Sequence, residues 1–331
     1  MKEYSYLMDF FRQTDGAYLG QLSFEPDFVP AIQWARFQEL KTHNPQALLR
    51  ALFKVEPIWH PYQGEPYVGG ITVSAYEAGK PPRTYEFPVS YFRTTAARLS
   101  DHFVKKNLLR ESELFYYVVT AVRTRPESSR QDSSPHENST TSCQGLPKLR
   151  DDCIDSYLKG SEAREEIDLQ DFPLFLLQDL LEEIERLSLE AGPNERGGVL
   201  LGYLCRDTKE KQIFGVVTAQ FNTSHCIENP SSFTFTPRAW KSVEDLIRLR
   251  DKGEILLGWW HCHPEHKPSP NGPTNCLTFF SDKDCHLHRT VFYPAWCIGL
   301  LITRLPGRAV HCACYGWRYG EICRRGFYVL R

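Results

Sequence analysis

The sequence has no long hydrophobic run, no strong excess of one charge and no cysteine before residue 143. Its longest apolar stretches, such as residues 295–302, are far shorter than the roughly 20 residues that a membrane span needs. The first eleven residues include Lys2, Glu3 and Asp9, so we expect no secretory signal there. These features predict a cytoplasmic protein with no membrane partner.

The charges are nearly balanced, with 39 Lys and Arg against 41 Asp and Glu. Because no basic run is present, we expect no nucleic-acid partner, since such binding depends on neutralising phosphates. The eleven cysteines are an odd number, and all lie at or beyond Cys143. In a large chain without an export signal, this favours reduced thiols over a disulfide framework.

Composition divides the chain of 331 residues into two domains and a linker. Residues 126–145 are rich in Ser, Thr, Asn, Gln and Pro and nearly free of large apolar side chains. Such a segment cannot bury enough surface to become ordered, and the charged run at 151–166 either extends it or forms a solvated helix. We therefore predict an accessory α+β domain at 1–125, a flexible linker at 126–166 and a second domain at 167–331.

Hydrophobic spacing predicts the elements of both domains. In the first domain we expect helices at 33–52 and 94–109, and strands at 67–76, 85–92 and 113–123. In the second domain we expect helices at 171–190, closed by Gly192, and at 237–251. Its expected strands are 198–204, 213–221, 255–261, 296–303, 309–316 and 327–330. Helices flanking a mostly antiparallel sheet predict the α+β fold class.

Two histidines stand two residues apart in the segment Gly-Trp-Trp-His-Cys-His-Pro at 258–264. Alternate residues of a strand point to the same face, so His261 and His263 would present both imidazoles to one site, and Cys262 would point away. Two imidazoles suit zinc, and a catalytic zinc takes a third protein ligand and keeps one position open. We predict His261 and His263 as metal ligands.

A third ligand is offered by Ser281-Asp282-Lys283-Asp284. A helix starting near Ser281 would place Ser281 and Asp284 on one face, although the pattern alone also fits a helix capping box. Glu195 lies at the mouth of the expected strand 198–204, beside glycines that allow close backbone approach, where a carboxylate can reach a metal-bound water; by itself it is typical of an exposed turn. Together, in this order, these residues predict one zinc ion per chain, held by His261, His263 and Asp284.

Glu195, then His261-x-His263-Pro, then Ser281-x-x-Asp284 resembles the signature of the JAMM (MPN-domain, prokaryotic JAB-like) metalloprotease family. The resemblance covers about residues 171–303. It implies a cytidine-deaminase-like α+β fold and hydrolysis of an amide by a metal-activated water. It further implies Glu195 as general base and Ser281 as a donor to the oxyanion.

The segment between the histidines and Ser281 is longer than is usual in the family. Residues 265–280 contain three prolines and Cys276, and we predict a loop over the site. Aligning Ser269 instead would put Gly272 at the carboxylate position and leave no ligand. Further along, we expect one of His286 and His288 to orient the site, rather than a second metal centre. Cys312 and Cys314 are expected to pack in a strand.

The family resemblance also implies a substrate class. Family members commonly cut the bond after the C-terminus of ubiquitin or a ubiquitin-like protein, so the resemblance implies such a protein or its conjugates as partners. It also implies conjugation enzymes of the same system, with bacterial defence as a setting. A metallo-amidase acting on small molecules or short peptides, and a non-catalytic MPN-type scaffold, stay open as alternatives. For the N-terminal domain we expect a role in holding the substrate or its target.

Overall fold

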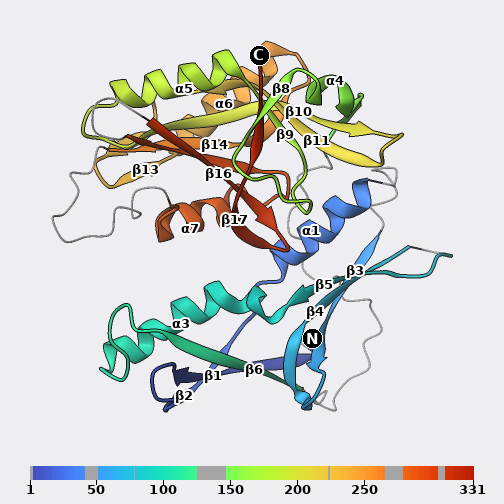
Figure 1. The fold of residues 1–331 in the computed structure, drawn as a ribbon, viewed down its shortest axis with the longest axis vertical. Helices are drawn as coiled ribbons and strands as arrows, with labels where there is room; N and C mark the ends of the chain where they lie inside the picture. Colours follow the sequence, from blue (N-terminus) through green and yellow to red (C-terminus); the bar gives the residue numbers. More distant parts are fainter. Residues whose placement is uncertain are drawn as a thin grey trace. The chain divides into compact units, whose positions relative to one another are not determined.

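A computed structural model describes residues 3–41, 51–77, 79–124, 147–222, 224–264, 279–304 and 310–331 (Figure 1). The chain divides into two compact units. The first comprises residues 1–35 and 49–145, and the second comprises residues 36–48 and 146–331. Within the described ranges, no helix is long and apolar enough to cross a membrane.

The first unit is built on a six-stranded antiparallel sheet. The strand order is β2 (Tyr18–Phe24), β1 (Tyr4–Arg12), β6 (Phe115–Arg123), β4 (Gly64–Tyr76) and β3 (Leu52–His60), with β5 (Arg83–Pro88) paired to β4. Its helical elements are the start of α1 (Val29–Leu40), the 3-10 helix η1 (Val89–Phe92) and α3 (Arg93–Lys105). Alternate residues of β1 are buried, and one of them, Phe10, packs against Phe103 of α3. This alternation is the period of two that a sheet covered on one face requires.

The predicted helix at 33–52 differs from the observed α1. The helix begins at Val29, where the backbone N–H is bonded to the Asp27 carboxylate and Pro30 takes up a first-turn position. It ends at Leu40, and residues 42–50 lie outside the described residues. Residues from Leu52 form β3, which pairs along most of its length with β4. Pairing with the neighbouring strand β4 thus overrides a local helical pattern.

The second unit contains a ten-stranded mixed sheet. The strand order is β17 (Glu321–Arg325), β16 (Val310–Arg318), β15 (Ile298–Arg304), β14 (Ile255–His263), β10 (Arg196–Asp207), β11 (Gln212–Phe221), β9 (Leu174–Leu177), β18 (Phe327–Leu330) and β8 (Ser161–Arg164), with β7 (Leu149–Asp151) paired to β10. A small hairpin joins β12 (Ile227–Asn229) to β13 (Ser232–Thr234). The α+β class is therefore confirmed, while parallel pairs such as β14 with β15 make the large sheet mixed.

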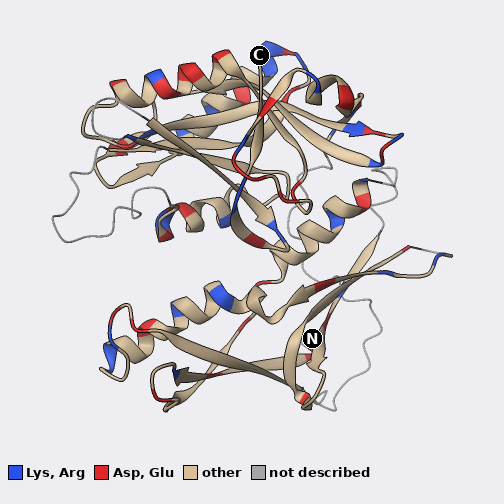
Figure 2. Cartoon of the chain, viewed as in Figure 1, with Lys and Arg blue, Asp and Glu red and all other residues tan. Residues whose placement is uncertain are grey.

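Helices cover both faces of this sheet. On one face, the Cys262 thiol of β14 points to the carbonyl of Ser188 in α5 (Gln178–Glu190). On the other, Trp259 shares a core cluster with α6 (Pro237–Arg250) and with residues of α7 (Asp282–Thr290). The short α4 (Ile154–Leu158) packs through Ile154 against a second cluster. Figure 2 marks α5 as mostly acidic, with one basic residue among the acidic ones, as on a solvated helix face.

Two segments of the second unit differ from the prediction. The expected helix at 171–190 starts only at Gln178, because residues 174–177 form β9 between β11 and β18. Within the expected linker, β7, α4 and β8 are regular elements, and β7 and β8 belong to the large sheet. Residues 126–146 of that linker lie outside the described part of the chain. Gly192 closes α5 as expected, with φ of +64°.

Candidate metal centre

Strand β14 carries both predicted histidines to its carboxyl end. There it lies between β10 and β15, with His261 opposite Gly197 on one side and Leu301 on the other. Earlier in the strand, Gly258 has φ of +155°, and a Cβ atom there would come within 2.0 Å of the Ile298 carbonyl oxygen. Only glycine permits this close approach of the two backbones. The approach holds β14 against β15 just before the histidines.

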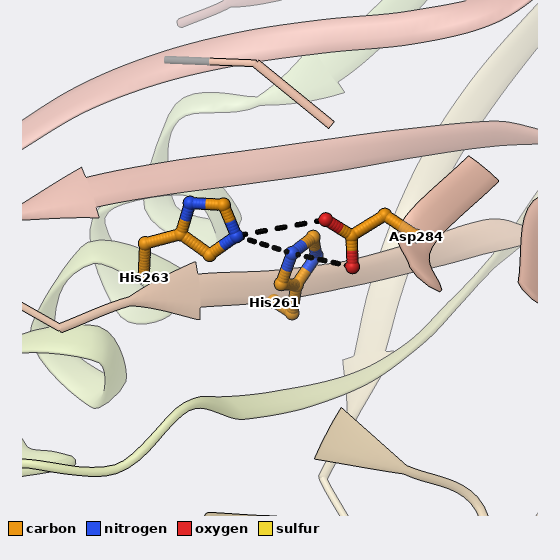
Figure 3. A group of neighbouring side chains, drawn as sticks. All are labelled: His261, His263 and Asp284. Carbon is orange, nitrogen blue, oxygen red and sulfur yellow. Dashed lines mark hydrogen bonds and ion pairs between the residues drawn. The ribbon is translucent and has the colours of Figure 1, made fainter. Parts of the chain in front are cut away.

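His261, His263 and Asp284 converge on one point (Figure 3). The two histidine Nε2 atoms are 3.2 Å apart. The Asp284 carboxylate lies 3.2 Å from His261 Nε2 through one oxygen and 3.6 Å from His263 Nε2 through the other. Within the described ranges, this is the one group of three or more His, Cys, Asp or Glu side chains arranged to hold a metal ion.

These distances fit a metal ion bound to all three residues. Ligand atoms about 2.0–2.1 Å from a tetrahedral zinc lie about 3.3 Å from one another. The two histidine nitrogens are 3.2 Å apart and lie 3.2 and 3.6 Å from the two oxygens of the Asp284 carboxylate, close to that spacing. Two imidazole nitrogens and one carboxylate are also donors that zinc accepts, and three protein ligands leave a fourth position open. The residues therefore fit a catalytic type of metal site.

The start of α7 orients Asp284. Ser281 is the N-cap residue, and its Oγ accepts a hydrogen bond from the Asp284 backbone N–H at 3.3 Å. In return, the Ser281 backbone N–H donates to the Asp284 carboxylate at 2.8 Å. Burial alone would raise the pKa of Asp284, but the two histidines and Ser281 outweigh it and hold that pKa far below its usual range. The capping box thus presents an ionised carboxylate to the histidines.

Glu195 is buried immediately before β10, with 8% of its surface exposed. Its backbone N–H donates to the carbonyl of Asn229 at 2.8 Å. Burial raises the pKa of Glu195, while the nearby His261 and His263 oppose the rise. A carboxylate whose pKa is raised toward neutrality is suited to accept and return a proton. Glu195 is thus under the electrostatic influence of both histidines, although it is not one of the three converging ligands.

A tryptophan–histidine pair supports His261 from behind, and only part of it was predicted. The Trp259 ring stacks on His261, with centroids 4.6 Å apart and planes within 9° of parallel. Trp259 Nε1 donates to Nδ1 of His288 at 3.1 Å. His288 is fully buried, so it is His288 that lies behind the site. The sequence contained a signal for Trp259, since a residue two before His261 shares its face of the strand.

Residues 177–272 match the family of prokaryotic homologs of the JAB domain. The matched segment includes Glu195, His261 and His263. The chain contains a prokaryotic JAB domain. Ser281 and Asp284 lie beyond the matched residues, so their association with the JAB domain depends on the geometry of α7.

Two further proteins are similar to parts of this chain. Over 102 residues the chain is 28% identical to a protein of Enterobacter hormaechei subsp. hoffmannii (strain UCI 50) named CD-NTase/cGAS isopeptidase. The similarity covers 30% of this chain and 53% of the other, so the chain spans about half the length of this curated relative. The solution structure of protein DSY2949 from Desulfitobacterium hafniense matches 47% of this chain and 92% of its own, with 18% identity and a TM-score of 0.34.

The structure also shows where two predicted core cysteines and the end of the predicted loop lie. Cys262 is buried, and its sulfur accepts the backbone N–H of Arg196. Cys314 is buried in β16, as expected for a packed residue. Phe280, predicted to end a loop over the site, lies with its ring centroid 5.8 Å from that of His261 and packs on Tyr315 with centroids 4.1 Å apart. The rest of that loop, residues 265–278, lies outside the described residues.

Proposed function

We propose that this chain is a zinc-dependent peptidase that cleaves the bond after the C-terminus of a ubiquitin-like protein, by deconjugation or precursor processing. The observation that carries the proposal is the convergence of His261, His263 and Asp284 at zinc-ligand spacing, beside a buried Glu195. A JAB domain in the chain, and a relative named as an isopeptidase, favour an isopeptide or peptide bond as the target.

Each side chain has a role in this proposal. His261, His263 and Asp284 would hold the zinc. A bound zinc supplies a Lewis acid, which polarises a carbonyl group and lowers the pKa of water. Glu195 takes a proton from the attacking water and passes it to the leaving amine. Ser281 Oγ already accepts from the Asp284 N–H, so its hydroxyl proton is available to stabilise an oxyanion.

Zinc content per chain tests the metal site. By mass spectrometry, we expect about one zinc in the unchanged protein and almost none in His263→Ala. Cys262→Ser is the matched control, because Cys262 lies in the same strand but points to α5. It should keep the metal. An unchanged protein without zinc, purified with added metal and no chelator, would exclude the metal site and favour a non-catalytic scaffold.

Cleavage of a fusion between a ubiquitin-like protein and a reporter tests the chemistry. Replacing the general base in Glu195→Gln should lower kcat by about 10²- to 10⁴-fold while zinc content stays unchanged. Short amide substrates should be cut poorly by comparison. Efficient cleavage of short amides, with none of the fusion, would replace the proposal by a metallo-amidase.

The proposal includes a cellular setting. The relative's name links an isopeptidase to CD-NTase/cGAS proteins, which supports a place for this chain in bacterial defence. Conjugation enzymes of the same system would then be its partners, and the cytoplasm its location. Co-purification of a ubiquitin-like protein with the Glu195→Gln protein would identify the substrate.

A further inference from the structure

Arg304 lies at the carboxyl end of β15, next to the end of β14 that carries the histidines. Only 6% of its surface is exposed. None of the ion pairs among the described residues includes Arg304. A buried guanidinium needs hydrogen-bond acceptors in place of water, so its contacts show what it holds.

The Arg304 guanidinium is bonded to three backbone carbonyls around the candidate site. Nε donates to the carbonyl of His263 at 3.2 Å. Nη2 donates to the carbonyl of Asn194 at 3.2 Å, and Nη1 donates to that of Gly192. Gly192 and Asn194 belong to the turn between α5 and β10. One side chain therefore ties this turn to the strand end at His263.

The peptide group between Asn194 and Glu195 is held at both ends. Its carbonyl oxygen accepts from Arg304 Nη2, and its N–H donates to the Asn229 carbonyl at 2.8 Å. This group fixes the backbone from which the Glu195 side chain extends. Through Nε, the same guanidinium fixes the backbone of His263. Arg304 therefore fixes the backbone of Glu195 relative to that of His263.

Arginine suits this place for a geometric reason. Its planar fork carries five N–H donors on three nitrogens, and here each nitrogen meets a different carbonyl. A lysine ammonium at the same place is a single nitrogen on a flexible stem and cannot span the three acceptors.

We propose that Arg304 is a positioning residue that sets the distance between Glu195 and the metal-binding histidines. This role rests on the proposed function, because the position of Glu195 matters to catalysis only if Glu195 is the general base. A reacting group displaced by about 1 Å can slow a reaction by about 10²-fold. Loss of the fork should therefore impair turnover more than substrate binding.

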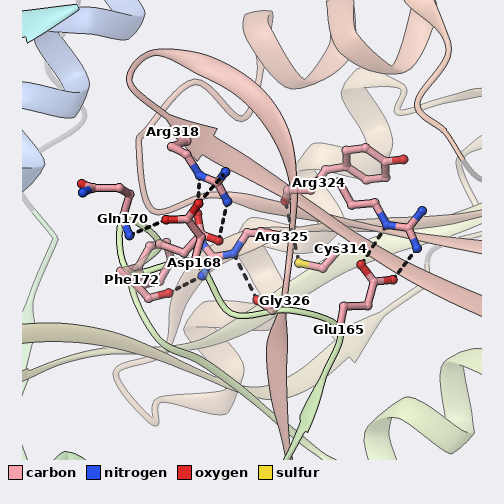
Figure 4. Close-up of polar contacts among 11 residues, drawn as sticks. Glu165, Asp168, Gln170, Phe172, Cys314, Arg318, Arg324, Arg325 and Gly326 are labelled. Carbon is pink, nitrogen blue, oxygen red and sulfur yellow. Dashed lines mark hydrogen bonds and ion pairs between the residues drawn. The ribbon is translucent and has the colours of Figure 1, made fainter.

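The test compares Arg304→Lys with Arg325→Lys. Arg325 is also buried and also donates to backbone carbonyls, those of Phe172 and Gly326 (Figure 4). Among the described residues, none of its hydrogen bonds reaches Glu195 or β14. Hydrogen exchange should be about tenfold faster for residues 192–198 in Arg304→Lys, and unchanged there in Arg325→Lys. With zinc saturating, kcat on the ubiquitin-like fusion should fall by about 10- to 100-fold in Arg304→Lys, with KM changed by less than about threefold.

Several results would overturn the positioning role. One is hydrogen exchange at residues 192–198 of Arg304→Lys that is as slow as in the unchanged protein. Another is an unchanged kcat in Arg304→Lys although exchange there is faster. The third is faster exchange over the whole large sheet of that variant. Arg304→Gln is a second variant with the same expected result, and it avoids a buried unpaired charge if Arg304→Lys does not fold. If the unchanged protein cuts no fusion, the proposed function fails, and local exchange alone then decides whether Arg304 fixes the turn.

Discussion

His288 is a buried histidine that is connected to the metal-binding residue His261 through the ring of Trp259. Burial and the neighbouring Arg289 lower the pKa of His288 to about 3. The neutral ring can therefore accept the Trp259 N–H, and Trp259 stacks on His261. A protonated His288 would lose this acceptor and place a charge in the core. At the scale of residues, the support of His261 depends on His288 staying neutral.

This pKa gives the stability of the domain a predictable dependence on pH. The unfolded chain binds the His288 proton with a pKa near 6.5, but the folded chain binds it only near 3. The stabilisation is thus complete above pH 6.5 and is lost as the pH falls toward 3. Between pH 6.5 and 5.0 the loss should be about 1.5–2 kcal/mol. His288→Asn keeps an acceptor near Nδ1, so its free energy of unfolding should not fall by this amount between the two pH values. Urea unfolding at both pH values measures the difference. Equal losses in both proteins would contradict the prediction.

At the scale of elements, the first turn of α7 connects helix stability to the metal site. In the capping box, Ser281 and Asp284 exchange two hydrogen bonds, and Asp284 also faces the histidines. Ser281→Ala should lower the free energy of unfolding by about 0.5–2 kcal/mol and weaken zinc binding, because Asp284 becomes less constrained. Ser281→Asn keeps a cap acceptor and should retain more of both. Thermal unfolding and zinc competition measure the two effects. An unchanged zinc affinity in Ser281→Ala would show that the helix cap does not contribute to metal binding.

The close approach of β14 and β15 leads to a second prediction about elements. A Cβ atom at Gly258 would meet the Ile298 carbonyl in a backbone conformation that disfavours side chains. Gly258→Ala should therefore lower the free energy of unfolding by about 1–3 kcal/mol and reduce zinc content. Gly160→Ala is the control, since a Cβ atom there meets nothing within 4 Å. Similar unfolding midpoints for the two variants in urea would show that β14 and β15 can move apart at Gly258 without loss of stability.

The elements around the site were predictable where a local signal marks them. The two histidines two residues apart indicated β14, and Ser281 with Asp284 indicated the start of α7. β9 was missed because a short apolar run does not by itself distinguish a buried strand from a helix. The role of Arg304 could not be read from the sequence either, because its acceptors are separated from it by 41 to 112 positions.

At the scale of the whole molecule, the division into units does not follow the predicted domain boundary. Residues 36–48 group with the second unit, and Phe37 packs edge-on against Phe172 with centroids 5.2 Å apart. A deletion of residues 1–125, designed to test substrate holding by the accessory domain, would therefore also remove Phe37. A loss of activity in that fragment could then come from the missing accessory domain or from the missing Phe37 ring.

Phe37→Ala in the full chain tests the contribution of the Phe37 ring by itself. Truncating this buried ring should lower the stability of the JAB-containing unit by about 3–5 kcal/mol. Phe103→Ala, in the core of the first unit, is the matched control and should leave hydrogen exchange of β9 unchanged. If β9 exchanges at the same rate in both variants, Phe37 does not stabilise the second unit, and the deletion test is free of this complication.

The position of β18 has a consequence for biosynthesis. β18 fills the place between β9 and β8, yet it follows β9 by roughly 150 residues. At about 5–20 residues per second, a ribosome needs roughly 8–30 s to translate that distance. Until then, β9 has an edge whose N–H and C=O groups lack their final partner, and such edges pair readily with other chains. The newly made protein would therefore benefit from a chaperone during this interval, and slower translation would lengthen the exposure.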